Sequence, residues 1–429
     1  MTGRFWLVCL AILAFFIVAL FSLRGDLIAL IMPLALYLAA AVFQAPERIR
    51  LSAERLLNSA EVSEKKAVLV TVRVRNEGSE LQEMILQDIL PHHPAVVDGE
   101  IRHFTILPPG ESFEFQYFIT LPRGKYEFQG LHALAADPFG FFQSESNVTA
   151  EASLTVMPLF YSIRSPIIRP RQTRGFAGSI PARIPGSGTD FYGVRQYQPG
   201  DPLRRINWHV AAHSGDDLYS NEYEQERIAD VGIILDARKQ TDIRAPHTSL
   251  FEYSVRAAGS LAEAYLREGH RVGLLIYGNG IERVFPGYGK MQRERISRAL
   301  AEARTGENFA LESFNFLPVR FFPPKSQIVL VSPLMLEDIK VLGRIRSHGY
   351  EVLVISPDPV HFEAAFYQAE DIARLAVRLA VIERQLMLRR MRRVGIRVID
   401  WSVERDLGEV IRISPDRRPA ARLVWEALT

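Results

Sequence analysis

The pattern of apolar and polar positions begins with two long apolar runs. Phe5 to Leu23 contains 19 residues without a charge, and Leu27 to Phe43 contains 17. A helix needs about 20 apolar residues to cross the hydrocarbon core of a bilayer. A cleavable signal peptide, the alternative, has a shorter apolar region followed by small residues, whereas a second apolar run follows here. We therefore expect residues 1–48 to form two transmembrane helices, over 5–23 and 27–43, within the lipid bilayer.

The charges that flank these runs predict their orientation. Arg4 precedes the first run, and Arg48, Arg50 and Arg55 follow the second, while the connection carries one arginine and one aspartate. Cytoplasmic flanks of membrane helices are enriched in arginine and lysine. We expect a multi-pass protein of the cell membrane whose N-terminus and soluble domains lie in the cytoplasm.

Apolar residues then recur at every second position. Val68, Val70, Val72 and Val74 alternate with polar residues or leucine, and the alternating segments are bounded by turns rich in glycine and proline. Alternation of this kind is typical of antiparallel strands with one buried face. Residues 49–160 are predicted to form an all-β, immunoglobulin-like sandwich.

A basic segment follows, with four prolines, five arginines and no acid over residues 161–185. Its composition predicts a linker. Contact of its arginines with anionic lipid is the alternative.

From residue 227 to residue 429 short aliphatic runs alternate with stretches long enough for helices. One such stretch ends at Gly269, a residue type that favours helix termination. This alternation predicts a mostly parallel, Rossmann-like sheet with helices on both faces. Together with residues 186–226, which we treat as a separate segment, the pattern indicates a multi-domain protein.

The first strand of this α/β region ends at Asp236, a position that resembles the start of the metal site in von Willebrand factor A domains. That site follows the pattern Asp-x-Ser-x-Ser, but here Arg238 and Gln240 stand at the serine positions. Magnesium prefers oxygen ligands, and an arginine brings a competing cation. We expect a degenerate site without metal, in which Asp236 pairs with a basic residue. A magnesium-dependent protein-binding module that uses Asp236 is the alternative.

Composition narrows the chemistry further. Lys and Arg number 51 and acids 49, so a net charge of +2 gives no reason to expect nucleic-acid binding. The single cysteine, Cys9, excludes a disulfide within the chain and a cysteine-based zinc site. No combination of nucleophile and base is evident, so we expect no catalytic residues and no cofactor.

Residues 186–208, GSGTDFYGVRQYQPGDPLRRINW, combine glycines, acids, arginines and aromatic residues. We expect the glycines and prolines to form a turn, and Asp201 to cap a short helix in which Leu203, Ile206 and Val210 share a face. Because the neighbours of the acids are arginines, which do not transfer protons, this segment favours structure or partner recognition over catalysis. A hydrolase that uses Asp190 or Asp201 is the least favoured reading.

This segment closely resembles the signature of the domain of unknown function number 58 family. The matching positions are Gly188, Asp190, Phe191, Arg195, Tyr197, Gly200, Asp201, Arg204, Arg205, Ile206 and Trp208. A second resemblance lies in the sandwich region, at Arg123, Gly124, Tyr126, Asp137, Pro138, Phe139 and Gly140. The resemblance implies paired membrane helices, a sandwich and a degenerate von Willebrand factor A-like domain. It also implies that the protein works with a MoxR-type AAA+ ATPase and with other von Willebrand factor A proteins. Its role would be that of a membrane-anchored, non-enzymatic scaffold or adaptor in the assembly or maturation of a client complex.

Overall fold

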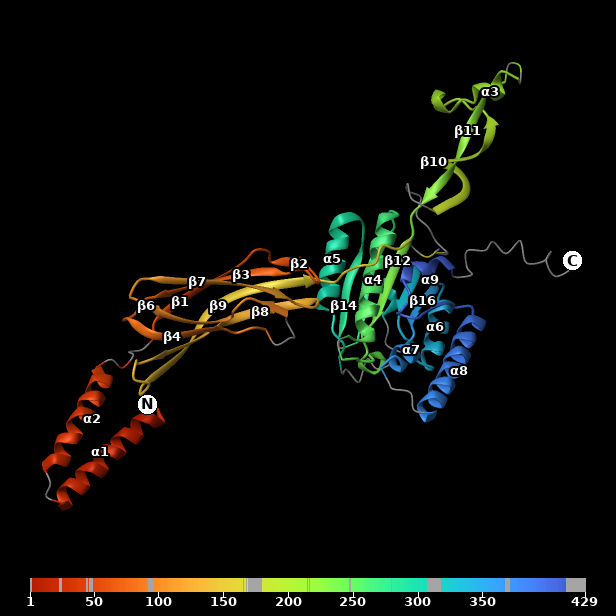
Figure 1. Cartoon of the computed structure of the whole chain (residues 1–429). Coiled ribbons are helices and arrows are strands. Elements are labelled where there is room, and N and C mark those ends of the chain that lie inside the picture. The colour runs from red at the N-terminus through yellow and green to blue at the C-terminus, as the bar shows by residue number, and fades with distance from the viewer. Residues whose placement is uncertain are drawn as a thin grey trace. The chain divides into compact units, whose positions relative to one another are not determined.

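The computed structural model describes residues 2–413, except 23–24, 44, 46–48, 92–95, 165, 167, 169–179, 214, 216, 247, 279, 307–317 and 367–370. The chain divides into two compact units, Met1–Met157 and Pro158–Thr429. Most of the predicted basic linker, including Arg169, Arg171 and Arg174, lies outside the described residues, as do Arg24 and Arg48 beside the apolar runs. Figure 1 shows the order of the elements along the chain.

The first unit begins with helices α1 (Gly3–Ser22) and α2 (Gly25–Phe43), which contact each other. Within the described residues only α1 is long and apolar enough to cross a membrane, a property it shares with signal sequences. Among the described residues of α2, the apolar stretch Ile31–Phe43 is shorter than a membrane span needs. The described residues therefore do not support the second transmembrane helix that the sequence predicted. Large apolar side chains on both helices are exposed, among them Phe21 and Phe43.

Two β-sheets complete this unit. The four-stranded sheet has the order β1 (Leu51–Leu57), β3 (Val68–Asn76), β7 (Ser112–Thr120) and β5 (Val96–Asp98). The five-stranded sheet has the order β2 (Glu61–Ser63), β9 (Gln143–Met157), β8 (Gly124–Ala136), β4 (Leu81–Asp88) and β6 (Arg102–Leu107). Neighbouring strands run antiparallel, apart from the parallel pair β2 and β9.

The alternation in the sequence places the core between these sheets. The four valines of β3 at positions 68, 70, 72 and 74 are buried and pack in one cluster with Leu86 of β4, Leu131 of β8 and Leu154 of β9. The first unit is therefore rich in β structure and contains two packed sheets, as the period of two predicted.

A charged pair lies inside this apolar core. The guanidinium of Arg55 in β1 donates to the carboxylate of Asp88, and the Tyr117 hydroxyl donates to the second oxygen of that carboxylate at 2.7 Å. The side chains of Arg55 and Asp88 are both inaccessible to solvent. Burial raises the pKa of the Asp88 carboxyl, while Arg55 and Tyr117 oppose that shift. These contacts join the two sheets, because Arg55 and Tyr117 belong to one sheet and Asp88 to the other.

The turn between β8 and β9 is held by Asp137, which the sequence resemblance had singled out. Its carboxylate accepts from the backbone N–H groups of Phe139 at 3.2 Å and Phe142 at 2.6 Å. Gly140 has a φ of 71°, a left-handed conformation that glycine adopts without strain. Asp137 is fully buried, so its two acceptor bonds define the shape of this turn.

The same turn contacts both N-terminal helices. The Thr2 hydroxyl donates to the Gly140 carbonyl at 2.8 Å, and the Phe5 ring lies 5.4 Å from that of Phe142. The ring of Tyr37 in α2 lies 4.9 Å from Phe139 and 5.4 Å from the Phe141 ring. The helices are therefore packed on the sandwich through this turn as well as joined to it by the chain.

The other part of the sandwich resemblance lies at the start of β8. The Tyr126 hydroxyl donates to the Pro122 carbonyl at 2.8 Å. A Cβ at Gly124, where φ is 154°, would lie 3.3 Å from the Tyr126 ring. Arg123 and Gly124 therefore form part of a corner that Tyr126 closes.

The second unit is built around a six-stranded sheet. Its order is β14 (Ile281–Gly287), β13 (Arg271–Tyr277), β12 (Asp230–Asp236), β15 (Gln327–Val331), β16 (Glu351–Pro357) and β17 (Arg397–Trp401). All neighbours are parallel except β13 and β14. The mostly parallel sheet predicted by the buried aliphatic runs is thus confirmed.

Helices cover both faces of this sheet. On one face α4 (Leu250–Arg267), α5 (Gly289–Glu302) and α9 (Leu407–Ile413) pack over Ile233, Leu274 and Val329. On the other face α6 (Asp338–Ser347) and α8 (Asp371–Arg393) pack over Ile234 and Leu330. The short helix α7 (Pro359–Ala364) follows β16. Consecutive residues of the central strands therefore belong to opposite cores, which explains why these strands are apolar at nearly every position.

Candidate functional site

Most of the signature segment forms one strand of an antiparallel pair, and a turn follows at Pro199 and Gly200. Strand β10 spans Ile180–Gln196 and pairs with β11, Tyr219–Arg227, with register shifts at Pro181, Gly186 and Phe191. Figure 1 shows this pair with the short helix α3 at its end. We call residues 180–227 the signature arm. The turn prediction was wrong for Pro185, Gly186, Gly188 and Gly193, which are accommodated as irregularities within a strand, and right for Pro199 and Gly200, which follow β10 as a turn.

Arg195 is the centre of the polar contacts in the signature arm. Its Nη2 donates to Asp201 Oδ1 at 2.6 Å, and its Nε lies 2.8 Å from Glu222 Oε1 on β11. The hydrogen bond from Arg195 lowers the pKa of the Asp201 carboxyl below its usual value. Arg195 therefore connects β10, the turn that follows it and β11. Arg195 thus forms charge-assisted pairs with Asp201 and Glu222.

A tight turn brings Asp201 to this arginine. Gly200 has a φ of 111°, and Asp201 donates its N–H to the Gln198 carbonyl at 3.0 Å. Asp201 Oδ2 in turn accepts from Gln198 N at 3.0 Å. The Tyr197 backbone N–H donates to Leu218 O at 2.8 Å, which continues the strand pairing up to this turn. Gly200 thus has a conformational role, because other residues avoid this φ.

The helix expected after Asp201 is interrupted. Residues Leu203–Arg205 form a 3₁₀ turn without a side-chain cap, and Asp201 caps no helix because Arg195 and Gln198 occupy its carboxylate. A separate short helix, α3 (Trp208–Ala211), is capped by Asn207, whose side chain accepts from Val210 N at 3.1 Å. The prediction of Asp201 as a cap was therefore wrong.

The signature arm exposes large apolar side chains. Leu203 is 71% exposed, Trp208 66% and Phe191 61%. Tyr192, Val194 and Leu218 are also exposed. Of the other signature positions, Ile206 is buried, Arg204 is exposed, and Arg205 lies over the Tyr223 ring at 5.7 Å. Gly188 and Asp190 lie in β10, but the Asp190 side chain falls outside the described residues.

A second polar cluster lies in the α/β region, where the metal site of von Willebrand factor A domains was expected to be degenerate. Arg238 donates through Nε and Nη2 to both oxygens of Asp236, at 2.9 and 2.8 Å. It donates through Nη1 and Nη2 to both oxygens of Asp338, at 3.0 and 2.9 Å. One guanidinium therefore bridges two carboxylates with paired hydrogen bonds, the strongest geometry available to arginine.

Neighbouring loops complete this cluster. The Ser332 hydroxyl, after β15, donates to Asp236 Oδ2 at 2.6 Å, and Met335 N donates to Asp338 Oδ2 at 2.8 Å. Asp236 and Ser332 lie at the carboxyl ends of adjacent parallel strands, where ligands of open α/β sheets bind. Gln240, by contrast, is exposed.

Burial closes the cluster to solvent. The side chains of Arg238 and Asp338 are each 2% exposed, and that of Asp236 is inaccessible. Burial alone would lower the pKa of Arg238, but the carboxylates of Asp236 and Asp338 raise it above its usual value. Burial raises the pKa of the Asp338 carboxyl, while Arg238 opposes this shift. The guanidinium is thus held as a permanent cation between the two acids.

Sequence reasoning missed three participants in these sites. Asp338 begins α6, six residues beyond Ser332, so it does not lie at the end of strand β15 itself. Its signal was an acid in the first turn of the helix that follows a parallel strand. Glu222 contacts Arg195 from the paired strand β11, and no local spacing marks it; Asn207, inside the signature segment, caps α3.

Comparison with known proteins agrees with the signature. A family model described as "Protein of unknown function DUF58" matches residues 193–361, from within β10 to α7. The uncharacterized protein YeaD of Bacillus subtilis (strain 168) is 25% identical over 339 residues, which cover 77% of this chain and 78% of that protein. Residues 193–361 of this chain therefore match the DUF58 family model, as the signature predicted.

Solved structures resemble parts of the chain only distantly. The CARDB domain of a Pyrococcus furiosus protein, crystallised with di-metal ions, is 18% identical and has a TM-score of 0.19, covering 27% of this chain and 98% of that one. A protein of unknown function from Porphyromonas gingivalis W83 is 15% identical with a TM-score of 0.20, covering 35% and 72%. Scores this low establish no shared fold.

Proposed function

We propose that this protein is a membrane-anchored, non-enzymatic scaffold whose signature arm binds another protein. The partner that we propose is a MoxR-type AAA+ ATPase, with other von Willebrand factor A proteins as further partners, in assembly or maturation of a client complex. The identity of these partners rests on the family resemblance, whereas the binding surface rests on the geometry of the arm.

The exposed apolar surface of the signature arm is the observation that carries this proposal. A ribbon of two strands cannot bury both of its faces, and an isolated pair is marginally stable in water. Here Phe191, Leu203 and Trp208 each expose more than half of their surface. Exposed apolar patches rimmed by polar groups mark interaction sites, and tryptophan and tyrosine are enriched among residues that dominate binding energy.

The polar groups of the signature arm support binding rather than catalysis. Asp201 is bound by Arg195, and the hydrogen bond keeps its pKa low, so it is an anion at neutral pH. A general acid or base needs a pKa near the working pH. Arginine does not exchange its proton in that range. The arginine network serves to hold the turn of the arm in one conformation.

We further propose that the second unit is a degenerate von Willebrand factor A-like domain. Support comes from the mostly parallel sheet and from the position of Asp236 at the end of its central strand β12. In this proposal Arg238 supplies the positive charge that a divalent cation supplies in metal-binding relatives. The resulting domain would present protein-binding surfaces without metal control.

The membrane anchor is part of the same proposal. Helix α1 has the length and composition of a span, and the exposed apolar side chains of α2 also need lipid or protein to cover them. We propose that both helices cross the bilayer as a hairpin, which places the N-terminus and the soluble units on the same side. The flanking arginines favour the cytoplasm, where the ATPase lies, as that side.

Co-purification tests the partnership. The full-length protein is extracted in detergent and captured with the MoxR-type ATPase of the same organism, in the presence of a slowly hydrolysed ATP analogue. A Leu203→Ser/Trp208→Ser variant should capture at least about tenfold less ATPase than the unchanged protein. Removal of central apolar anchors costs about 2 kcal/mol or more of binding free energy.

The matched control is Leu375→Ser, because Leu375 on α8 is 69% exposed and lies outside the signature arm. It should retain the ATPase at the level of the unchanged protein. Equal capture by the arm variant and the control would rule out the arm as the binding surface. No capture by the unchanged protein would rule out the partnership.

A further inference from the structure

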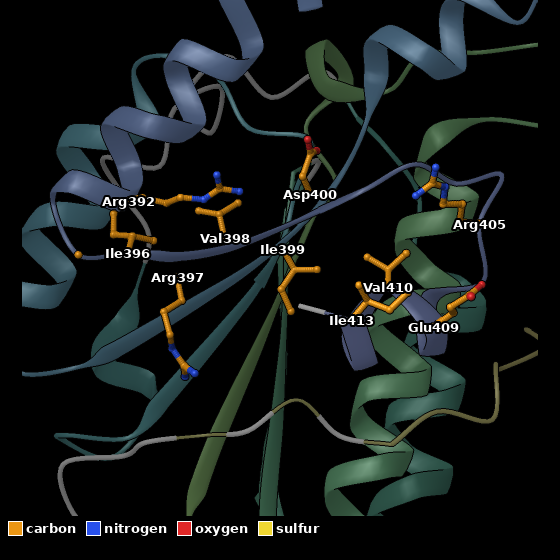
Figure 2. Close-up of a pocket in the computed structure, with 11 residues that line it drawn as sticks. Arg392, Ile396, Arg397, Val398, Ile399, Asp400, Arg405, Glu409, Val410 and Ile413 are labelled. Atoms are coloured by element: carbon orange, nitrogen blue, oxygen red, sulfur yellow. The ribbon is translucent and has the colours of Figure 1, made fainter. Parts of the chain in front are cut away.

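The last strand of the six-stranded sheet borders a groove. Strand β17 pairs with β16 on one side and is the terminal strand of the sheet on the other. A cavity of about 800 Å³ lies along it, between the end of α8 and helix α9. Figure 2 shows Val398 and Ile399 of β17 between Arg392 and Arg397 on one side and Val410 and Ile413 of α9 on the other. None of these residues belongs to the signature arm.

Backbone groups of β17 face this groove. The Trp401 carbonyl accepts from Asp358 N at 2.8 Å, so the backbone groups of Trp401 are directed toward β16. Successive residues of a strand direct their N–H and C=O groups to opposite sides. The groups of Val398 and Asp400 are therefore directed toward the open edge, where another extended chain could pair with them.

The side chains beside that edge combine apolar surface with positive charge. Ile396, Val398, Ile399, Val410 and Ile413 supply the apolar part of the lining. The charged lining residues are Arg392, Arg397, Arg405, Asp400 and Glu409.

Asp400 accepts a hydrogen bond from Arg384 of α8 at 2.7 Å, and the same guanidinium lies 3.3 Å from Asp358. Among the residues that the structure describes, Arg392 and Arg405 form no ion pair. The groove is thus electropositive, and its charge complements an acidic ligand.

The opposite edge of the sheet lacks these properties. Strand β14 contains Pro286, which has no N–H to donate, and its register with β13 shifts between Val272 and Leu274. Proline and irregular register protect edge strands from pairing with other chains. Strand β17 contains no proline and keeps an unbroken register with β16.

We propose that the β17 edge binds an extended, acidic segment of a partner protein, which adds a seventh strand to the sheet. The main chain of the segment pairs with Val398 and Asp400. Its apolar side chains enter the groove beside Val410 and Ile413, and its carboxylates contact Arg392 and Arg405. In strand addition, main-chain hydrogen bonds supply affinity and alternate side chains supply specificity.

The test uses the full-length protein in detergent and a fluorescent peptide of the sequence Val-Glu-Val-Asp-Val-Glu-Val, followed by fluorescence anisotropy. We expect saturable binding, and at least about tenfold weaker binding by an Arg392→Glu/Arg405→Glu variant, the scale found when charge pairs at interfaces are broken. The control is Arg283→Glu/Arg389→Glu, which makes the same change in net charge at exposed arginines outside the groove. It should bind as the unchanged protein does.

Two further probes separate strand addition from simple charge attraction. A peptide with proline in place of its third residue, a valine, keeps its charge but loses a main-chain donor, and it should bind at least about tenfold more weakly. A peptide with lysine in place of each acid should not bind. Undiminished binding of the proline peptide would overturn the proposal, as would equal loss in both double variants.

Residues 414–429 follow Ile413 directly and are the competing occupant. If the peptide binds a chain that ends at Ile413 but does not bind the full chain, then the groove serves the chain's own terminus and the proposal of a partner segment is wrong. Equal binding by both chains supports it.

Discussion

Arg238 donates to both oxygens of Asp236 and to both oxygens of Asp338, and its side chain is 2% exposed. The arginine occupies a place at the carboxyl end of the sheet where acids from two loops converge. Two carboxylates and one guanidinium leave one negative charge, which the Ser332 hydroxyl and the backbone N–H groups of the loops stabilise. The cluster therefore depends on Arg238 more than on any other member.

Loss of this arginine should destabilise the second unit strongly. An Arg238→Met variant leaves two buried acids without their cation, and breaking a buried pair in this way costs about 3–5 kcal/mol. Guanidinium chloride unfolding of the full-length protein in detergent measures the change. The triple variant Arg238→Met/Asp236→Asn/Asp338→Asn, which removes both acids as well, should recover part of the loss. If the triple variant is no more stable than Arg238→Met, then packing of the arginine, and not its charge, stabilises the fold.

Removal of Arg238 should also create affinity for a divalent cation. In an Arg238→Ser variant, Asp236, Asp338, Ser332 and the new hydroxyl supply hard oxygen ligands, which suit magnesium. Millimolar magnesium should raise the unfolding midpoint of this variant, since a ligand that binds only the native state stabilises it. The unchanged protein should give no heat with magnesium or manganese in calorimetry beyond that of an Asp236→Ala variant. Metal heat that disappears in Asp236→Ala would contradict this and favour a metal-dependent module.

The Arg195–Asp201 contact predicts a titration. Because the folded pKa of Asp201 is lowered from its ordinary value of 3.8, the unfolded chain binds more protons between the two values. The stabilisation is therefore present above pH 3.8 and is lost as the pH falls through the lowered pKa. An Arg195→Gln variant should raise the pKa of Asp201 toward its ordinary value, as measured by carboxyl ¹³C NMR of aspartate-labelled protein. Arg205→Gln should have a smaller effect, and an unchanged pKa in Arg195→Gln would refute the contact.

In the sandwich, Tyr117→Phe should lower stability by about 1–3 kcal/mol, because the buried Asp88 carboxylate loses a hydrogen-bond donor. Arg55 remains paired with Asp88, so the variant should still fold. Denaturant unfolding of the full-length protein provides the measurement. Tyr192→Phe, at a position that is 43% exposed, is the matched control and should stay within about 0.5 kcal/mol. Equal effects at the two positions would mean that the Tyr117 hydroxyl contributes nothing specific.

The spacing of apolar residues predicted the sheets of both units because burial of those residues determines which strands form. The alternating valines of β3 and the aliphatic run of β12 each have one arrangement that removes them from water, and the structure contains both. The signature arm was harder to predict. Gly186 and Pro185 favour turns locally, yet pairing with β11, more than 30 residues away in sequence, places them in a strand. Strand pairing is tertiary, and local propensity does not encode it.

The polar centres show the same limit. The sequence predicted a basic partner for Asp236, and Arg238 lies two residues away. Asp338 lies 100 residues from Arg238 along the chain, so only the fold brings the two together. Asp201 resembled a helix cap because proline follows it, but Arg195 binds its carboxylate more strongly than free helix N–H groups would. No fixed sequence spacing identifies the Arg238–Asp338 or the Arg195–Asp201 contact, so a single sequence does not predict either one.

The turn held by Asp137 has a mechanical consequence. Because its aromatic rings pack on Phe5 of α1 and on Tyr37 of α2, a force applied to the sandwich is transmitted to both helices at once. A connection by the chain alone would leave the sandwich free to move relative to the helices, whereas these ring contacts restrain both helices. A change in the position of the sandwich would therefore move its N-terminal helices as well.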